Sequence, residues 1–355
     1  MKKHSNYTAI SLFSGAGGLD IGFEQAGFDI IFANELDKDA ANTWMVNRPN
    51  SQAMHQGDLK SYLHSLSSYG GVDVVFGGPP CQGFSVAGKM NPNDPRSKLI
   101  WSFLDVVSCV QPKVFIIENV RALGTLSKWQ SVRQEIIARA HQLGYHCDFA
   151  IYSASNYGVP QNRERVVFFG SKNLHSQNEF FCHMLASKTD PKPLRKVLNA
   201  VGKFGTKDNP QTCTAHVSLA QKPILRKSPY AGMLVNGAGR PINLDGIAQT
   251  LPASMGGNKT PIIDQAALDE SLENWFVGYH RALLEGKTSP EKAHVPETVR
   301  RLTIKEAAAL QTFPSAYKFC GKKTQQYKQI GNAVPVNFAK EIGLSIYKAL
   351  KGTKT

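Results

Sequence analysis

The sequence of 355 residues has no run of eighteen apolar residues, and its beginning lacks the apolar stretch and small-residue cleavage site of a signal peptide. A membrane-spanning or secreted protein is therefore not expected. Six scattered cysteines form no Cys-x-x-Cys pair and no array with histidine at zinc spacing, so neither a disulfide framework nor a metal site is indicated. We expect a cytoplasmic globular protein with reduced thiols.

Acidic residues are scarce relative to basic ones. The 27 aspartates and glutamates face 41 lysines and arginines, which gives a net charge of +14 at pH 7, and nearly all of this excess falls after residue 170. A neutral first half joined to a basic second half suggests a catalytic body next to a region that contacts a polyanion. The alternative is a basic surface that serves only solubility.

Short β-rich runs alternate with amphipathic helical stretches between residues 7 and 170, which is typical of a doubly wound α/β domain with a parallel sheet. A helix with a buried face is predicted between Trp129 and Leu143. After Lys172 the helical rhythm ends and proline, glycine, asparagine and lysine become frequent, which predicts a smaller, loop-rich second domain. Strands are predicted near residues 8–13, 29–34, 72–76, 114–118, 148–152 and 165–169.

Regular structure is predicted again near the C-terminus. Thr303 and Glu306 have the spacing of a capping box, so a helix is expected to begin there and to end near Pro314. A final helix is expected from an apolar stripe that runs from Val336 to Leu350.

A glycine-rich turn, Phe13–Leu19, connects the first predicted strand to a helical stretch. Such turns let backbone amides approach a ligand at the carboxyl edge of a sheet, although they also serve tight packing. Glu35 ends the next strand, where a carboxylate typically accepts hydrogen bonds from ribose hydroxyls. Asp58 is either a ligand of an adenine amino group or a turn cap. Because the Gly-x-Gly-x-x-Gly fingerprint is missing, we expect a nucleoside ligand rather than NAD.

Cys81 lies in a polar, glycine-flanked segment that follows the strand ending at Phe76. A lone cysteine is usually a small buried hydrophobe, but a core cysteine does not need such a loop. Glu118 ends a strongly hydrophobic strand, where a carboxyl group must be either partnered or protonated. Arg163 and Arg165 precede another strand, and they belong either to the same site or to a pair of surface salt bridges.

Taken together, these segments resemble the DNA (cytosine-5)-methyltransferases. The similarity spans residues 8–350 in the order of that family's motifs and leaves only about 171–298 unmatched. The matching segments are Phe-Ser-Gly-x-Gly-Gly at 13–18, Glu35, Pro-Pro-Cys-Gln at 79–82, Glu-Asn-Val at 118–120, Gln-x-Arg-x-Arg at 161–165, Arg-Arg-Leu-Thr at 300–303 and Gln-Ile-Gly-Asn-Ala-Val-Pro at 329–335.

The resemblance gives each candidate catalytic residue a role. Cytosine C5 is a poor nucleophile until a thiolate adds to C6 of the ring, which explains Cys81. Glu118 is expected to bind N3 and the exocyclic amine, and Arg165 to bind O2. Arg163 and Arg165 are the candidates for the positive charge that favours the thiolate. The target base must leave the helix to reach these groups, and the segment 82–98 is expected to close over it.

The family uses S-adenosylmethionine, and the resemblance places its site around the glycine-rich turn, the ends of the first strands and the C-terminal return of the chain. No metal is expected. The implied cofactor residues are Phe13, Ser14, Gly15, Ala16, Gly17, Gly18, Leu19, Glu35, Leu36, Asp58, Leu59, Gly78, Pro80, Leu99, Asn332 and Val334.

The family's variable region recognises DNA, which divides the chain into a catalytic domain (1–180), a target-recognition domain (181–298) and a hinge with a C-terminal return (299–355). Arg240 either reads guanine or contacts a phosphate. The implied DNA-binding residues are Ser85, Arg96, Arg240, Thr250, Asn258 and Lys259.

The resulting hypothesis is sequence-specific methylation of cytosine C5 in double-stranded DNA by a monomeric modification enzyme, with or without a separate restriction endonuclease. Transfer to tRNA by the same fold is the main alternative. A protein that binds DNA without turnover and an NAD-dependent oxidoreductase are further alternatives, which the intact motifs and the missing dinucleotide fingerprint respectively oppose.

Overall fold

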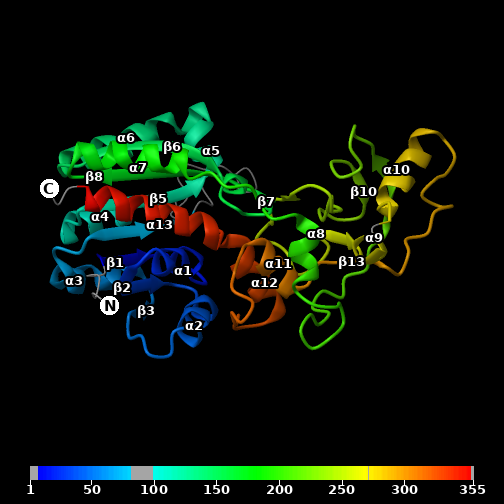
Figure 1. Ribbon diagram of the computed structural model, residues 1–355, viewed down its shortest axis with the longest axis horizontal. Helices are drawn as coiled ribbons and strands as arrows, with labels where there is room; N and C mark the ends of the chain where they lie inside the picture. The colour runs from blue at the N-terminus through cyan, green and yellow to red at the C-terminus, as the bar shows by residue number, and fades with distance from the viewer. Residues whose placement is uncertain (1–6, 81–98, 271, 353–355) are drawn as a thin grey trace. The chain divides into compact units, whose positions relative to one another are not determined.

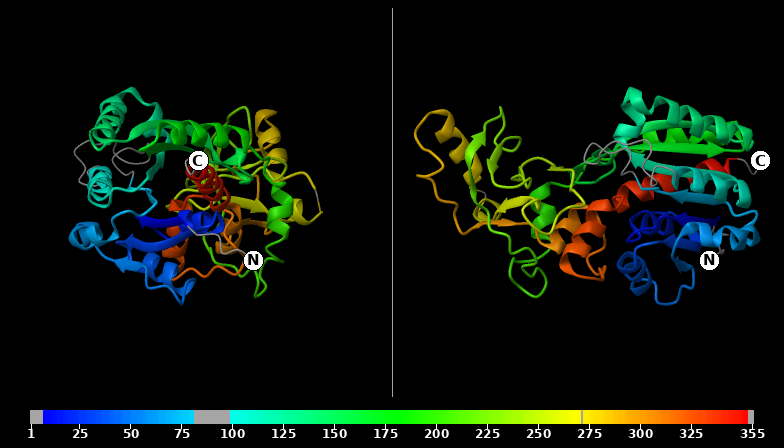
Figure 2. Two further views of the ribbon diagram at one scale, coloured as in Figure 1. Left: turned by 60° about the vertical axis from the view of Figure 1, so that its left-hand side comes forward. Right: turned by 180° about the vertical axis from the view of Figure 1, so that it is seen from behind.

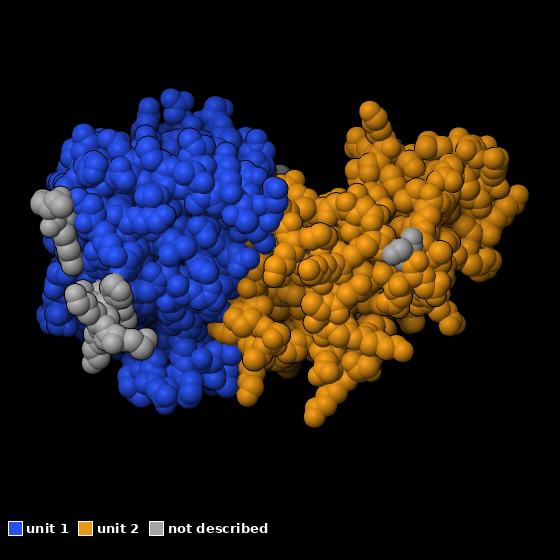
Figure 3. Space-filling model, viewed as in Figure 1, with its two compact units in different colours: residues 1–158, 163–190, 334–355 blue, residues 159–162, 191–333 orange. Residues whose placement is uncertain are grey.

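The computed structural model describes residues 7–80, 99–270 and 272–352. The chain divides into two compact units, which Figure 3 shows in different colours. Unit 1 contains residues 1–158, 163–190 and 334–355, and unit 2 contains residues 159–162 and 191–333. The chain therefore passes four times from one unit to the other. In the described part of the chain, no helix is both long and apolar enough to cross a bilayer.

Unit 1 is built on a seven-stranded sheet in the order β3-β2-β1-β4-β5-β8-β6. Its strands are β1 (Tyr7–Leu12), β2 (Phe28–Glu35), β3 (Met54–Gln56), β4 (Val74–Gly77), β5 (Val114–Val120), β6 (His146–Ser153) and β8 (Glu164–Ser171). The six strands predicted from the sequence are confirmed, and only the short β3 was not predicted. The strands β1 to β5 run parallel to one another.

The prediction of a parallel sheet is wrong at β8, which is antiparallel to both of its neighbours, β5 and β6. Only the residues 154–163 connect β6 to β8. A parallel connection needs a crossover of a dozen or more residues, so this short connection permits only the antiparallel arrangement.

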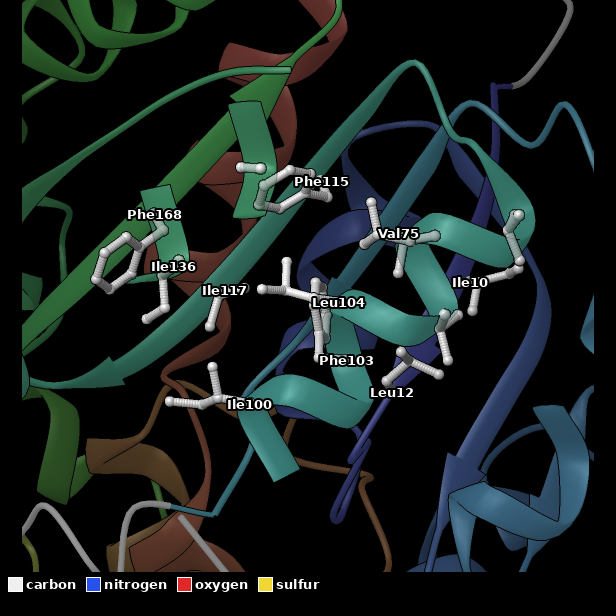
Figure 4. Packing of buried hydrophobic residues seen from close by; sticks show 14 of the residues in the cluster. Ile10, Leu12, Val75, Ile100, Phe103, Leu104, Phe115, Ile117, Ile136 and Phe168 are labelled. Carbon is white, nitrogen blue, oxygen red and sulfur yellow. The ribbon is translucent and has the colours of Figure 1, made fainter. Parts of the chain in front are cut away.

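Helices cover both faces of this sheet. Phe76 stacks on Phe23 of α1 with ring centroids 3.9 Å apart, and Phe169 stacks on Phe180 of α7 at 4.3 Å. The residues next to them in sequence, such as Phe168, point to the opposite face and pack against α4 and α6 (Figure 4). The doubly wound α/β fold is therefore confirmed. The helices of this unit are α1 (Gly18–Gln25), α2 (Lys38–Val46), α3 (Leu63–Leu66), α4 (Leu99–Val110), α5 (Arg121–Thr125), α6 (Gln130–Gln142), α7 (Leu174–Ala186) and α13 (Val336–Lys351).

The last helix, α13, completes the first unit. It lies beside α1 and α7 (Figures 1 and 2). Its contact with α1 depends on glycine, because a Cβ atom at Gly22 would lie 2.4 Å from Cβ of Ala339. Both α13 and α6 were predicted. The helix α7 was not, and it shows that the predicted loss of helical rhythm after Lys172 is wrong as far as Ala186.

Unit 2 has few and short elements, as predicted. Its described residues form three two-stranded ladders, β9 with β10, β11 with β7, and β12 with β13. Its strands are β7 (Gln161–Asn162), β9 (Leu219–Ile224), β10 (Met233–Val235), β11 (Ala248–Gln249), β12 (Ile262–Asp264) and β13 (Val299–Arg301). Its helices are α8 (Leu194–Asn199), α9 (Gln265–Glu270), α10 (Trp275–Leu284), α11 (Ile304–Leu310) and α12 (Lys323–Asn332).

The predicted capping box is present at the start of α11. The Thr303 hydroxyl accepts the N–H of Glu306 at 3.1 Å, and the Glu306 carboxylate accepts the N–H of Thr303 at 2.9 Å. The helix ends at Leu310, before Pro314, as expected.

Candidate active site

The glycine-rich turn between β1 and α1 is held against the end of β2. The backbone reverses through left-handed conformations at Gly15 (φ 55°) and Gly17 (φ 82°), which favour glycine. The N–H of Gly15 donates to Oε2 of Glu35 at 2.7 Å. The structure thus brings the glycine-rich turn and the Glu35 carboxylate together, as expected if both bind the same nucleoside ligand. Phe13 also has a positive φ of 56°, and the side chains of Ser14, Ala16 and Leu19 are buried.

Backbone amides fix the orientation of the Glu35 carboxylate. Besides the bond from Gly15, its Oε1 accepts the N–H of Asp37 at 2.7 Å. Burial raises the pKa of Glu35, while these two backbone amides oppose that change. Each carboxylate oxygen has a second lone pair, so both can still accept a ligand hydroxyl. Next to it, Leu36 is 68% exposed and offers an apolar surface beside the carboxylate.

The loop that carries Asp58 is also tied to this corner of the sheet. The N–H of Gly57 donates to the carbonyl of Glu35 at 2.9 Å. Oδ1 of Asp58 accepts the N–H of Lys60 at 3.0 Å and caps a short 3-10 helix, as a turn cap does, and its second oxygen can still accept a hydrogen bond from a ligand. Asp58 is exposed, whereas the Leu59 side chain is buried in the core of unit 1.

The end of β4 approaches the end of β5 closely. A Cβ atom at Gly78 would lie 3.0 Å from Oε2 of Glu118. Nδ2 of Asn119 donates to the carbonyl of Pro79 at 3.1 Å. Gly78, Pro80 and Glu118 are therefore gathered at one edge of the sheet, and Leu99 begins α4. The predicted site residues Cys81, Ser85 and Arg96 lie outside the described residues.

Glu118 has the partner that a buried carboxylate requires. Nε of Arg165 lies 2.7 Å from Oε1 of Glu118, and both side chains are largely buried. Arg163 is 2% exposed. The alternative in which both arginines form surface salt bridges is therefore wrong; the exposed ion pair of this region joins Arg121 to Glu164.

Sequence reasoning did not assign a role to Asn119. Its Oδ1 accepts the N–H of Val120 at 2.9 Å, which orients Nδ2 toward Pro79. The side chain is 2% exposed. Its place directly after Glu118 in the Glu-Asn-Val motif was a signal, but the carbonyl that it holds lies 40 residues away in the sequence.

In unit 2, three of the predicted DNA-binding residues line one cavity of about 290 Å³. These are Arg240, Thr250 and Lys259, and Tyr230 and Gln249 also contribute. No acidic residue is among the described residues of its lining. Nη1 of Arg240 donates weakly to the carbonyls of Gly237 and Gly239, at 3.3 and 3.4 Å. The arrangement offers two cations and several amide and hydroxyl groups, a set that suits a nucleic acid.

The Arg-Arg-Leu-Thr segment holds the glycine-rich loops of unit 2, a role that the sequence did not reveal. Arg301 is 3% exposed. Its guanidinium donates to the carbonyl of Thr260 at 2.7 Å, of Ala215 at 3.1 Å and of Asn258 at 3.3 Å. The predicted DNA contact Asn258 is thus fixed through its backbone while its side chain is exposed.

The C-terminal cofactor candidates belong to different units. Asn332 is the last residue of α12 in unit 2 and is exposed, whereas Val334 is buried in unit 1. Among the residues that the structure describes, no group of histidine, cysteine, aspartate and glutamate side chains could hold a metal ion. Unit 1 therefore has a doubly wound α/β fold with candidate ligand groups at the carboxyl ends of β1, β2, β4 and β5.

Comparisons with known proteins identify the family. The model for C-5 cytosine-specific DNA methylases matches residues 7–348. Type II methyltransferase M1.HphI of Haemophilus parahaemolyticus is 32% identical over 96% of this chain and 87% of its own length. Type II methyltransferase M.FnuDI of Fusobacterium nucleatum is 32% identical over 96% and 94%. The crystal structure of S. pombe Dnmt2 methyltransferase, 16% identical, aligns with a TM-score of 0.66 over 99% of this chain and 100% of that one.

The chain therefore belongs to the C-5 cytosine-specific DNA methylase family, and its enzyme class is that of the DNA cytosine-C5 methyltransferases. The similarity to solved structures supports the same Rossmann-like methyltransferase fold.

Proposed function

We propose that this protein transfers a methyl group from S-adenosylmethionine to C5 of a cytosine within a specific sequence of double-stranded DNA. The observation that carries the proposal is the buried Glu118–Arg165 pair beside Gly78, three residues before Cys81. The members named Type II methyltransferases support a role as a modification enzyme, paired with a restriction endonuclease or acting alone.

The residues around the glycine-rich turn fit S-adenosylmethionine, which supplies an electrophilic methyl group on a sulfonium. Glu35 presents oriented carboxylate oxygens to the ribose hydroxyls, and the exposed Leu36 offers an apolar face to the adenine. The space beside Gly15 is open, because a Cβ atom there would meet no described atom within 4 Å beyond its chain neighbours. We assign cofactor contacts to Phe13–Leu19, Glu35, Leu36, Asp58, Leu59, Gly78, Pro80, Leu99, Asn332 and Val334.

The chemistry begins at Cys81. Its thiolate adds to C6 of the cytosine, while Glu118 hydrogen-bonds to N3 and the exocyclic amine and Arg165 to O2. This addition makes C5 nucleophilic, and C5 then takes the methyl group as its bond to the sulfonium sulfur breaks, which leaves S-adenosylhomocysteine as the product. A base, for which water suffices, removes the C5 proton, and the electrons of that C–H bond restore the ring as the S–C6 bond breaks. Arg165 and Arg163 contribute the positive charge that favours the thiolate.

The target cytosine cannot undergo this reaction inside a stacked duplex, so it must rotate out of the helix at a cost of a few kcal/mol. Phosphate contacts made by the basic second half of the chain offset that cost. We assign DNA contacts in unit 2 to Arg240, Thr250, Asn258 and Lys259, and phosphate contacts to Ser85 and Arg96.

The experiment uses the full-length protein, S-adenosylmethionine with a labelled methyl group, and either duplex DNA of mixed sequence or total tRNA. Label at cytosine C5 of DNA is expected, with little in tRNA. The variant Glu118→Gln should lower the transfer rate by roughly 10²-fold or more, because it removes a group that acts on the ring nitrogen. Label in tRNA alone, or in neither nucleic acid with folded protein, contradicts the proposal.

A further inference from the structure

Two buried glutamines connect separate segments of unit 2. Gln161 is fully buried, and Nε2 of its side chain donates to Oε1 of Gln311 at 3.1 Å and to the carbonyl of Leu310 at 3.4 Å. Oε1 of Gln161 accepts the N–H of Leu251 at 3.0 Å. A single side chain thus joins the segment that contains the predicted DNA contact Thr250 to the end of α11.

Gln311 extends this connection. It is also fully buried, and its Nε2 donates to the carbonyls of Ile330 and Ala333 at 2.7 and 3.3 Å. The bonds fix the direction of both amides, because reversing Gln161 would set its NH₂ group against the N–H of Leu251. The two side chains therefore form one directed relay from Leu251 to the end of α12.

Three further contacts hold the same segments together. β11 pairs with β7, and the Thr250 hydroxyl donates to the carbonyl of Asn162. A Cβ atom at Gly331 would lie 2.5 Å from the carbonyl oxygen of Pro252, so only glycine permits this approach. The segment 248–253 contributes to the lining of the cavity around Arg240. These contacts fix it against β7 at one end and against Gly331 of α12 at the other.

The relay ends where the chain enters the catalytic unit. Asn162, next to Gln161, is followed by Arg163, the first residue of the stretch that carries Arg165. Ala333 is followed by Val334, the first residue of the C-terminal return. Two of the four passages between the units therefore begin at residues whose carbonyl groups are held by hydrogen bonds. Gln311 of the relay holds Ala333, and Thr250, next to Leu251, holds Asn162.

We infer that Gln161 and Gln311 are positioning residues that couple recognition of the DNA sequence to the rate of methyl transfer. The inference rests on the proposed function. When the DNA sequence does not match, the segment 248–253 shifts and moves the N–H of Leu251. The relay transmits this shift to the chain segments that lead to Arg165 and Val334. Discrimination between cytosines is then expressed in the transfer step as well as in binding.

The test uses the variants Gln161→Met and Gln311→Met, which keep the approximate length of the side chain but cannot make the hydrogen bonds. Gln142→Met, at an exposed position of α6, is the matched control. The target sequence is first found by bisulfite sequencing of DNA from a host that expresses the wild type. Single-turnover transfer is then measured on that duplex and on duplexes with one changed base pair.

Each relay variant is expected to transfer about tenfold more slowly on the target duplex and less than twofold more slowly on the changed ones, so that discrimination falls by about five- to tenfold. The affinity for S-adenosylmethionine should stay within about twofold. A purely structural defect would lower the fraction of active enzyme. The active fraction would then keep the wild-type rate constant and the wild-type discrimination, and this result overturns the inference.

A double-mutant cycle separates a relay from two independent roles. Because the relay is already broken by either change, Gln161→Met/Gln311→Met should be about as slow as each single variant. Rates that fall by the product of the two single effects contradict the relay. If the wild type transfers no methyl group, the proposed function fails; if it does and the variants discriminate normally, the relay alone fails.

Hydrogen exchange gives a readout that does not need activity. Gln311 bonds to Gln161, and it is Gln161 that accepts the N–H of Leu251. Faster exchange of the Leu251 amide in Gln311→Met is therefore expected only if Gln161 transmits the change. Unchanged exchange across residues 248–253 in that variant overturns the inference.

Discussion

The guanidinium of Arg165 and the carboxylate of Glu118 form a buried ion pair, with Nε 2.7 Å from Oε1. The two residues lie on antiparallel neighbours, β8 and β5, where Val120 is opposite Arg165. Each charge has left water, and each depends on the other for its stability in the protein interior. The same carboxylate lies close to Gly78, where an added Cβ atom would be 3.0 Å from Oε2, so the pair lies beside the segment that leads to Cys81.

Removing only one member of this pair should destabilise the protein strongly. Arg165→Ala leaves the Glu118 carboxylate buried without its partner, and we expect a loss of about 3–5 kcal/mol in the free energy of unfolding. Adding Glu118→Gln should recover part of that loss, because the remaining buried charge is removed. Urea unfolding of the two variants measures both effects.

Arg121→Ala is the matched control, since it breaks the exposed pair with Glu164 and should cost less than about 1 kcal/mol. Equal losses for Arg121→Ala and Arg165→Ala, or a double variant no more stable than Arg165→Ala, would contradict the role given to the buried pair.

Asn119 should act through the Pro79 carbonyl that it holds. Asn119→Ala removes the 3.1 Å bond and frees the backbone that precedes Cys81, so we expect the single-turnover transfer rate to fall by about tenfold or more. Cofactor affinity should fall by less than the transfer rate, because Gly15 and Glu35 are untouched and, of the assigned cofactor contacts, only Gly78 and Pro80 adjoin Pro79. Asn50→Ala, at an exposed position, serves as the control. A loss of cofactor affinity with a normal rate would place Asn119 in a different role.

The two cations of the cavity in unit 2 should have separable effects on DNA binding. If Arg240 reads a base edge, Arg240→Ala should relax the preference for one base pair by about 1–3 kcal/mol. Lys259→Ala should weaken binding to all sequences and reduce the slope of log K against log salt by about one. Binding isotherms over a salt series, on the target duplex and on duplexes changed at one position, distinguish the two. A uniform loss for both variants would make Arg240 a phosphate contact.

Asp20 should make the stability of unit 1 depend on pH. Burial raises the pKa of Asp20 to about 6, an effect that the nearby Arg48 and the 2.7 Å bond from Trp44 only partly oppose. Folding therefore favours the protonated form. The stability that this group contributes is complete below about pH 4 and is lost as the pH rises through about 6.

Asp20→Asn keeps an acceptor for Trp44 and cannot ionise, so it should be more stable than the wild type by about 3 kcal/mol at pH 8 and of similar stability at pH 4. Melting temperatures across this range test the difference. A variant that is less stable than the wild type at pH 8 would mean that the buried charge is compensated.

The sequence predicts the fold well where local patterns decide it. The runs of valine, isoleucine and phenylalanine gave six strands of the sheet, and Thr303 with Glu306 gave the start of α11. The predicted direction of β8 was wrong, because the direction of a strand depends on the length of its connection to β6 rather than on the residues of the strand itself. The helix α7 was missed because few of its residues are apolar and buried, chiefly Phe180 and Met184.

The candidate site divides in the same way. The contact between Gly15 and Glu35 could be expected, because the ends of neighbouring parallel strands meet at one edge of a sheet. The bonds of Gln161 to Gln311 and of Arg301 to Ala215 join residues 150 and 86 positions apart. No periodicity or spacing reveals such contacts, since they arise only when the loops of unit 2 are packed together.

The most direct test of the account is whether Cys81 bonds to a cytosine. A duplex that carries 5-fluorocytosine at the target position is incubated with the protein and S-adenosylmethionine, and complexes that survive denaturation are counted. Because fluorine cannot leave C5 as a proton does, the S–C6 bond should persist. We expect a denaturation-resistant complex with the wild type and none with Cys81→Ser. No complex with active wild-type protein, or an equal amount with Cys81→Ser, would contradict the mechanism.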